Sequence, residues 1–204
     1  LGEVKLRITA KSKTKNEAIK DIQPIKEELE SKFTKYIFGE DNDTLSSVII
    51  RLLKDRNESI VFAESCTGGL LSASITSEAG ASEIFKGGII AYSNEIKQNL
   101  LGVTKSCLDT HGAVSEEVAE KMAIGAKAKL NADWGIAISG IAGPKGGTEM
   151  KPVGLVHISI ISPNNKLTNI KKLYNSRRNR CEIQKLSVNE CLNSLRLILL
   201  SYKG

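Results

Sequence analysis

The sequence predicts an α/β fold: a three-layer α/β/α domain around a mixed, largely parallel sheet, with a small N-terminal strand–helix–strand remnant before it. From residue 44 onward, short apolar runs typical of buried strands alternate with stretches of helical periodicity. Residues 1–41 are instead dense in charge and hold one helical stretch between two strand-like runs. The 204 residues suffice for one substantial core and a small accessory element, so we divide the chain into residues 1–41 and 44–204.

The first segment reads as strand, helix and strand. Residues 4–8 alternate apolar and polar side chains, and residues 35–38 form the second strand-like run. Thr14 is expected to cap a helix that reaches Lys32, with Glu17 as its capping-box partner. About 40 residues cannot bury a core alone. Because the chain also opens on a strand-like run at Leu1 rather than at Met, we expect a piece of a longer protein.

The second segment holds five strand-like runs and at least five helical ones. The run at 59–63 is continuously apolar, as expected of a strand buried on both faces. The predicted strands are 59–63, 85–92, 134–138, 153–161 and 167–174. The predicted helices are 44–55, 70–77, one that ends at Gly102, 115–130 and 178–200.

Composition narrows the function classes. The net charge of +6 admits an anionic partner, but an aromatic content of 4% supplies few platforms for stacking nucleic-acid bases, which argues against nucleic acid. No apolar run approaches the ~18–20 residues that cross a bilayer. The four cysteines form no CxxC pair and only two histidines are present, so we expect no metal site and a reducing, cytoplasmic setting.

The first candidate site is the turn at residues 63–69, where a buried strand passes into a helix. Ser65 occupies a place like that of a nucleophile elbow, although the G-x-S-x-G pattern is absent. Backbone amides at such a turn suit a phosphate or a developing oxyanion equally well. The alternative is that Ser65 and Thr67 only cap the helix. Cys66 is the other possible nucleophile, but strand alternation should direct it inward if Ser65 points outward.

The second candidate site pairs Tyr92, at the end of a strand, with Lys97 on the following helix. A serine nucleophile needs a base, and histidine is scarce in this chain. A desolvated lysine has a lowered pKa and can take that role. Judged by composition alone, Lys97 is instead one surface lysine among many.

Two further segments carry polar or flexible residues that suit an anion. Residues 139–147 are glycine-rich and follow a buried strand, but no Gly-Lys-Ser/Thr closes a Walker loop, and a mobile connection is the alternative. Residues 177–180 begin the last helix with clustered arginines, which suit a phosphate or form a solvated face. His111 and His157 are interpreted as structural.

Four runs, in this order and spacing, resemble the nicotinamide-nucleotide amidohydrolase family, the C-terminal domain of CinA-type competence/damage-inducible proteins. Together they span most of residues 44–200, whereas each glycine-rich run alone would be weak. The segment 1–41 resembles the partial KH-like linker element that precedes this domain in longer CinA proteins. The matching runs are AESCTGGLL at 63–71, GGIIAYSNEIKQNLLGV at 87–103, HGAVSEEVAEKMAIGA at 111–126 and ISGIAGPKGGTEMKPVG at 138–154.

The resemblance implies hydrolysis of the carboxamide of nicotinamide mononucleotide to nicotinate mononucleotide and ammonia, as in pyridine nucleotide salvage, by a Ser–Lys mechanism without metal or cofactor. It implies Ser65 as nucleophile, Lys97 as its base and Tyr92 as a group that assists proton transfer or positions the intermediate. Arg177 would contact the phosphate, although Asn175 stands where the family has the glycine of a Gly-x-Arg element. The residues implied around the substrate are Thr67, Gly68, Gly69, Ser139, Gly140, Gly143 and Arg177.

Two other readings predict different behaviour. A non-catalytic nucleotide-binding module would keep its ligand after Ser65→Ala and release no ammonia. A nucleic-acid partner would bind with steep salt dependence, but the KH-like remnant is too incomplete to favour it. The expected partners are therefore a small nucleotide substrate and further copies of the chain, with no membrane.

Overall fold

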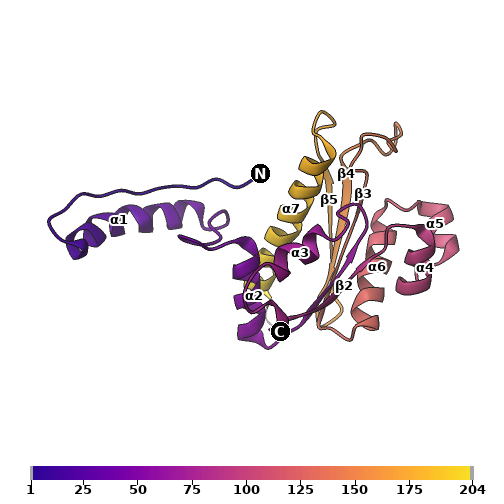
Figure 1. The fold of residues 1–204 in the computed structure, drawn as a ribbon, viewed down its shortest axis with the longest axis horizontal. Coiled ribbons are helices and arrows are strands. Elements are labelled where there is room, and N and C mark those ends of the chain that lie inside the picture. Colours follow the sequence, from indigo (N-terminus) through magenta and orange to yellow (C-terminus); the bar gives the residue numbers. More distant parts are fainter. Residues whose placement is uncertain (1, 203–204) are drawn as a thin grey trace. The chain divides into compact units, whose positions relative to one another are not determined.

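The computed structural model describes residues 2–202 and divides into two units, Gly2–Thr44 and a larger one that begins at Leu45 (Figure 1). None of the helices in this described range is long and apolar enough to span a bilayer.

The smaller unit consists of one helix and irregular chain. The helix α1 (Lys15–Phe33) starts with the expected capping box, because Thr14 and Glu17 bond each other's backbone amides. Pro24 lies inside the helix, which buries none of its residues. The predicted strands at 4–8 and 35–38 are wrong: neither run is a strand. A strand needs a neighbour to accept and donate its backbone hydrogen bonds, and this unit offers none.

The larger unit is built on a five-stranded sheet in the order β2-β1-β3-β4-β5. The strand β1 pairs in parallel with β2 and β3, while β4 is antiparallel to both of its neighbours. The sheet is therefore mixed, with β4 alone reversed. Its strands are β1 (Ile60–Glu64), β2 (Phe85–Ile90), β3 (Trp134–Gly140), β4 (Leu155–Ile161) and β5 (Leu167–Leu173).

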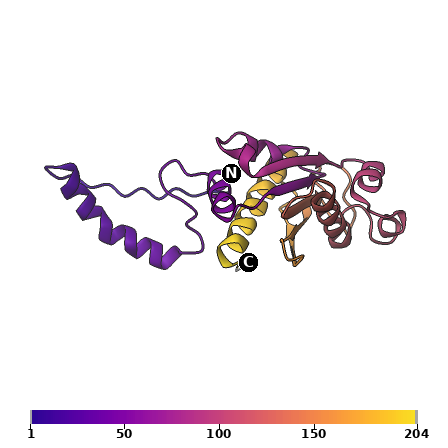
Figure 2. The ribbon, with the colours of Figure 1, turned by 90° about the horizontal axis from the view of Figure 1, so that it is seen from below.

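Helices cover both faces of this sheet, as the sequence predicts. One layer holds α2, α3 and α7, which contact one another, and the other holds α4, α5 and α6, with α6 packed along β1, β3 and β4. Figures 1 and 2 show α7 and α6 on opposite sides of the strands. The bounds are α2 (Leu45–Arg56), α3 (Leu70–Thr76), α4 (Asn94–Leu101), α5 (Lys105–His111), α6 (Glu116–Lys129) and α7 (Arg180–Ser201), with a short 3-10 helix at Ala81–Glu83.

Strand β1 lies at the centre of the hydrophobic core. All five of its residues are buried, and it sits between two parallel neighbours with a helical layer on each face. The continuous apolar run in the sequence is the signature of such a strand. Because β1, β2 and β3 run the same way, the segments that follow them emerge at one edge of the sheet.

Candidate active site at the carboxyl edge of the parallel strands

Three segments that the sequence singles out meet at this edge. The turn 65–69 follows β1, Tyr92 follows β2, and the glycine-rich loop follows β3. Ser93 caps α4 by accepting from the amide of Ile96, and this cap sets the start of the helix that carries Lys97.

The side chains of Lys97 and Ser65 are in contact. Nζ of Lys97 lies 3.2 Å from Oγ of Ser65, within hydrogen-bonding distance. The same nitrogen donates to the carbonyls of Ala91 at 2.7 Å and Tyr92 at 3.2 Å. Lys97 is only 1% exposed, and within residues 2–202 no carboxylate pairs with it.

Burial lowers the pKa of Lys97 below its ordinary value of 10.5. The physical cause is desolvation, which disfavours the charged ammonium when no counter-charge compensates. A neutral amine has two N–H donors, which match the two carbonyls, and one lone pair, which then remains for the hydroxyl proton of Ser65. This arrangement suits a general base.

Glu64, the last residue of β1, is fully buried and organises the turn that follows. Its two carboxylate oxygens accept from the backbone amides of Gly69, Leu71 and Ser72. They also accept from the hydroxyls of Thr67 and Ser72. The amides at the start of α3, which the sequence marks for an anion, are therefore occupied by a side chain of the protein itself.

The two glycines of the turn have conformations that only glycine adopts readily. Gly68 has φ of 61° and Gly69 has φ of 103°. A Cβ on Gly69 would also lie 3.2 Å from Cδ1 of Ile90. We therefore assign these glycines to the shape of the turn, and their contact with a substrate stays a prediction.

The surroundings of Cys66 do not suit a nucleophile. Burial raises the pKa of its thiol to about 12, so the reactive thiolate is disfavoured at neutral pH. Its sulfur lies on the inner side, where a Cβ on Gly140 would approach it to 3.1 Å. The side-chain amide of Gln184 donates to the carbonyl of Cys66 at 2.7 Å, tying α7 to the turn.

Arg180 is hydrogen-bonded to two segments of the site. The guanidinium of Arg180 donates to the phenol oxygen of Tyr92 at 2.9 Å and to the carbonyl of Gly143 at 3.0 Å. Arg177 is exposed, and its one recorded bond in the described chain is from its backbone amide to the side chain of Asn175. The phosphate contact expected of Arg177 stays a prediction, with Arg180 better placed to make it.

Two predicted substrate contacts already have partners within the protein. The hydroxyl of Ser139 is buried and donates to the carbonyl of Ala113 at 2.7 Å, and that of Thr67 is bonded to Glu64. His157 is buried within β4, and burial lowers its pKa. His111 pairs with Glu117 at 3.2 Å on the partly exposed surface. Within residues 2–202, no three His, Cys, Asp or Glu side chains gather as metal ligands.

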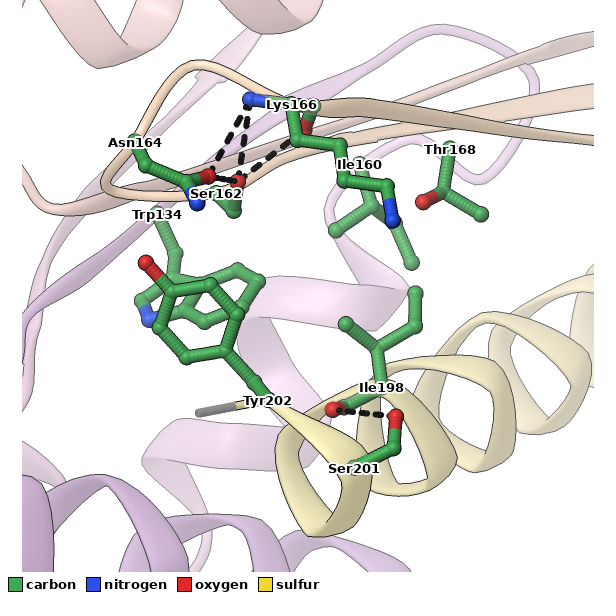
Figure 3. Close-up of a pocket in the computed structure, with 9 residues that line it drawn as sticks. All are labelled: Trp134, Ile160, Ser162, Asn164, Lys166, Thr168, Ile198, Ser201 and Tyr202. Atoms are coloured by element: carbon green, nitrogen blue, oxygen red, sulfur yellow. Dashed lines mark hydrogen bonds between the residues drawn. The ribbon is translucent and has the colours of Figure 1, made fainter. Parts of the chain in front are cut away.

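A hollow of about 280 Å³ lies at the other end of the sheet, between the β4–β5 connection and the end of α7 (Figure 3). The rings of Trp134 and Tyr202 form part of its wall. They pack edge to face, with their centroids 5.0 Å apart. None of the residues predicted for the site lines it, so we do not place the chemistry there.

Comparison with known proteins identifies the family. Residues 42–199 match the CinA C-terminal domain, and residues 1–39 match the damage-inducible protein CinA KH domain. The chain is 67% identical over 201 residues to a CinA-like protein of Prochlorococcus marinus strain AS9601, covering 98% of this chain and 47% of that protein. It is 46% identical over 198 residues to a CinA-like protein of Synechococcus sp. strain RCC307, covering 97% and 47%.

Solved structures give the same result. The competence/damage-inducible protein CihA from Agrobacterium tumefaciens superposes with a TM-score of 0.74 at 36% identity, covering 80% of this chain and 98% of that one. The chain thus spans about half the length of the curated relatives it matches, but nearly all of this solved protein. It belongs to the CinA family of competence/damage-inducible proteins.

Proposed function

We propose that the larger unit hydrolyses the carboxamide of nicotinamide mononucleotide to nicotinate mononucleotide and ammonia. The observation that carries this proposal is the 3.2 Å contact between Lys97 and Ser65, made by a buried lysine that has no carboxylate partner among residues 2–202. A surface lysine would remain charged and could not act as a base at neutral pH, whereas a desolvated one can.

The reaction follows from this geometry. Neutral Lys97 takes the proton of Ser65 as Oγ attacks the carboxamide carbon. The resulting oxyanion is held by the amides of Cys66 and Thr67, the two in the turn that have no carbonyl or carboxylate acceptor within the described chain. The ammonium of Lys97 then returns the proton to the amide nitrogen, the C–N bond breaks, and ammonia leaves.

The acyl–Ser65 ester is cleaved by the same base. Lys97 deprotonates a water molecule, which attacks the ester carbon. The ammonium of Lys97 returns this proton to Oγ as Ser65 leaves as its hydroxyl, and the product acid releases its own proton to water and departs as nicotinate mononucleotide. In this scheme Tyr92 borders the reacting end of the substrate, and Arg180 lies between Tyr92 and Gly143, in position to contact the phosphate.

The test is ammonia release from nicotinamide mononucleotide by the parent chain, Ser65→Ala and Lys97→Ala, each checked for folding by circular dichroism. We expect release by the parent and its loss in both variants. A folded parent that binds the nucleotide without releasing ammonia, and whose binding survives Ser65→Ala, would instead be a non-catalytic binding module.

A further inference from the structure

Glu64 and Ser65 are consecutive residues whose side chains engage opposite layers of the domain. The side chain of Glu64 is bonded to the first residues of α3, in one helical layer, while that of Ser65 contacts Lys97 of α4, in the other. The strand β1 ends at Glu64, but the amide of Ser65 still donates to the carbonyl of Ile138 in β3, so the two side chains leave on opposite faces as successive residues of a strand do. The position of Oγ of Ser65 therefore depends on how Glu64 is held.

The restraint on Glu64 is extensive. Its carboxylate accepts five hydrogen bonds from the turn and the start of α3, at 2.6–3.1 Å. Both oxygens are used, and every contact is with an N–H or O–H group. Within residues 2–202 the side chain forms no ion pair, and it is fully buried. Hydrogen bonds from the turn and from the start of α3 therefore stabilise the carboxylate without a positive counter-charge.

The same contacts decide which amides remain for the reaction. Glu64 engages the amides of Gly69, Leu71 and Ser72. Those of Gly68 and Leu70 bond carbonyls within the turn. The amides of Cys66 and Thr67, directly after the nucleophile, have no carbonyl or carboxylate acceptor in the described turn, and that of Cys66 lies against its own thiol. An anionic group of the substrate consequently finds no available amide at the start of α3.

We infer that Glu64 is a positioning residue: its carboxylate holds the 65–69 turn so that Ser65 reaches Lys97 and the amides of Cys66 and Thr67 form the oxyanion hole. This inference rests on the proposed function. Loss of the carboxylate should lower kcat and leave KM nearly unchanged, because the substrate's phosphate would bind near Arg180, on another segment. It should also leave the pH midpoint of activity unchanged, since Lys97 does not contact Glu64.

The test compares Glu64→Gln with the parent, using Glu83→Gln on the 3-10 helix as a matched control. Glutamine keeps the size of the side chain but presents an NH2 group to backbone N–H donors. We expect kcat to fall by about 10²- to 10³-fold with KM within about threefold, as for loss of an oxyanion-hole donor, and the control to stay within about twofold. A folded Glu64→Gln protein with parental kcat, or with the loss confined to KM, overturns the inference.

Thr67→Val decides the matter if Glu64→Gln does not fold. It removes one of the five bonds to the carboxylate and keeps the side chain's shape, and Thr76→Val, at the last residue of α3, is its control. We expect a kcat about three- to tenfold below that of Thr76→Val, a part of the loss expected for one oxyanion-hole donor. Equal rates in the two valine variants overturn the inference.

A second readout does not depend on the natural substrate. Phenylmethanesulfonyl fluoride reacts with a serine hydroxyl that is activated by a base. The intact mass reports the adduct, and peptide mass mapping places it at Ser65. If the parent reacts with this reagent but releases no ammonia, the proposed substrate is wrong, and slower labelling of Glu64→Gln still supports the positioning role. Equal labelling rates overturn that role, and a parent that neither reacts nor releases ammonia overturns both proposals.

Discussion

The guanidinium of Arg180 donates a hydrogen bond to the phenol oxygen of Tyr92 at 2.9 Å, joining the first turn of α7 to the segment that follows β2. The two residues lie 88 positions apart in the chain. Together with the bond from Arg180 to the carbonyl of Gly143, this contact brings an arginine to the border of the site.

Arg180→Ala should weaken substrate binding more than Arg177→Ala. Loss of a charge-assisted contact to phosphate costs about 1.5–3 kcal/mol, so we expect KM for nicotinamide mononucleotide to rise by about 10- to 100-fold. Arg177→Ala should stay within about twofold, because its side chain is exposed. Steady-state ammonia release gives KM for both variants. A larger rise in KM for Arg177→Ala than for Arg180→Ala would assign the phosphate contact to Arg177.

Lys97→Met should abolish activity without unfolding the protein. Methionine fills the buried space of the lysine stem but offers no base, so we expect kcat to fall by about 10³-fold or more. The free energy of unfolding at pH 7 should rise by about 1 kcal/mol, because burying the charge of Lys97 with no carboxylate partner in residues 2–202 costs more than its hydrogen bonds to the carbonyls of Ala91 and Tyr92 return. Activity assays and urea titrations measure these quantities.

Lys127→Met is the matched control for that variant. Its amine donates to the carbonyl of Ser162 at 2.7 Å, away from the dyad, and burial lowers its pKa as well. We expect activity within about twofold of the parent and a lower free energy of unfolding. Comparable loss of activity in both variants would mean that general disruption, rather than a missing base, explains Lys97→Met.

The rate should rise with pH as Lys97 loses its proton. The pKa of Lys97 lies below 10.5, so the midpoint of the rising limb of kcat/KM should also lie below 10.5. In the unfolded chain the lysine keeps its proton up to its ordinary pKa, and the folded state releases it earlier, so folding gains stability as pH rises between the two values. The stability advantage of Lys97→Met should therefore be largest below the folded pKa and shrink toward pH 10.5. A constant difference across pH would contradict this coupling.

Cys66 should react slowly with iodoacetamide at pH 8, whereas the exposed Cys181 should react readily. A thiol whose pKa is about 12 presents roughly one thiolate in 10⁴ at that pH. Peptide mass mapping over a time course separates the two sites. Cys66→Ala should reduce kcat by less than about fivefold, against about 10³-fold for Ser65→Ala. The opposite ranking would make Cys66 the nucleophile.

Periodicity predicts the elements of the larger unit because each strand and helix there has a partner that selects its apolar face. Residues 4–8 alternate as a strand should, yet they remain irregular, since residues 2–44 of the smaller unit contain no strand to pair with them. The helix α5 escapes prediction for a related reason: seven residues with one buried apolar side chain, Leu108, show no clear period. The hydrophobic pattern of a segment predicts its secondary structure only where a neighbouring element packs against its apolar face.

The residues of the candidate site could also be predicted only in part from the sequence. The contact between Ser65 and Lys97 matches what the family resemblance implies, but composition alone treats Lys97 as a surface residue. The choice between Arg177 and Arg180 depends on where α7 begins. Asn179 and Glu182 form a capping box, which makes Arg180 the first helical residue. The Asn-x-x-Glu spacing is present in the sequence, and this signal would have identified the better-placed arginine.

The bond between Gln184 and the carbonyl of Cys66 spans 118 positions along the chain. During translation, the ribosome exposes both members of the dyad long before the helix that braces them. A nascent polypeptide can thus pair β1 with β2 early, but it completes the pocket only after α7 has emerged. We therefore expect the proposed hydrolysis only from molecules whose synthesis has passed α7, and products truncated before this helix should consume no nucleotide.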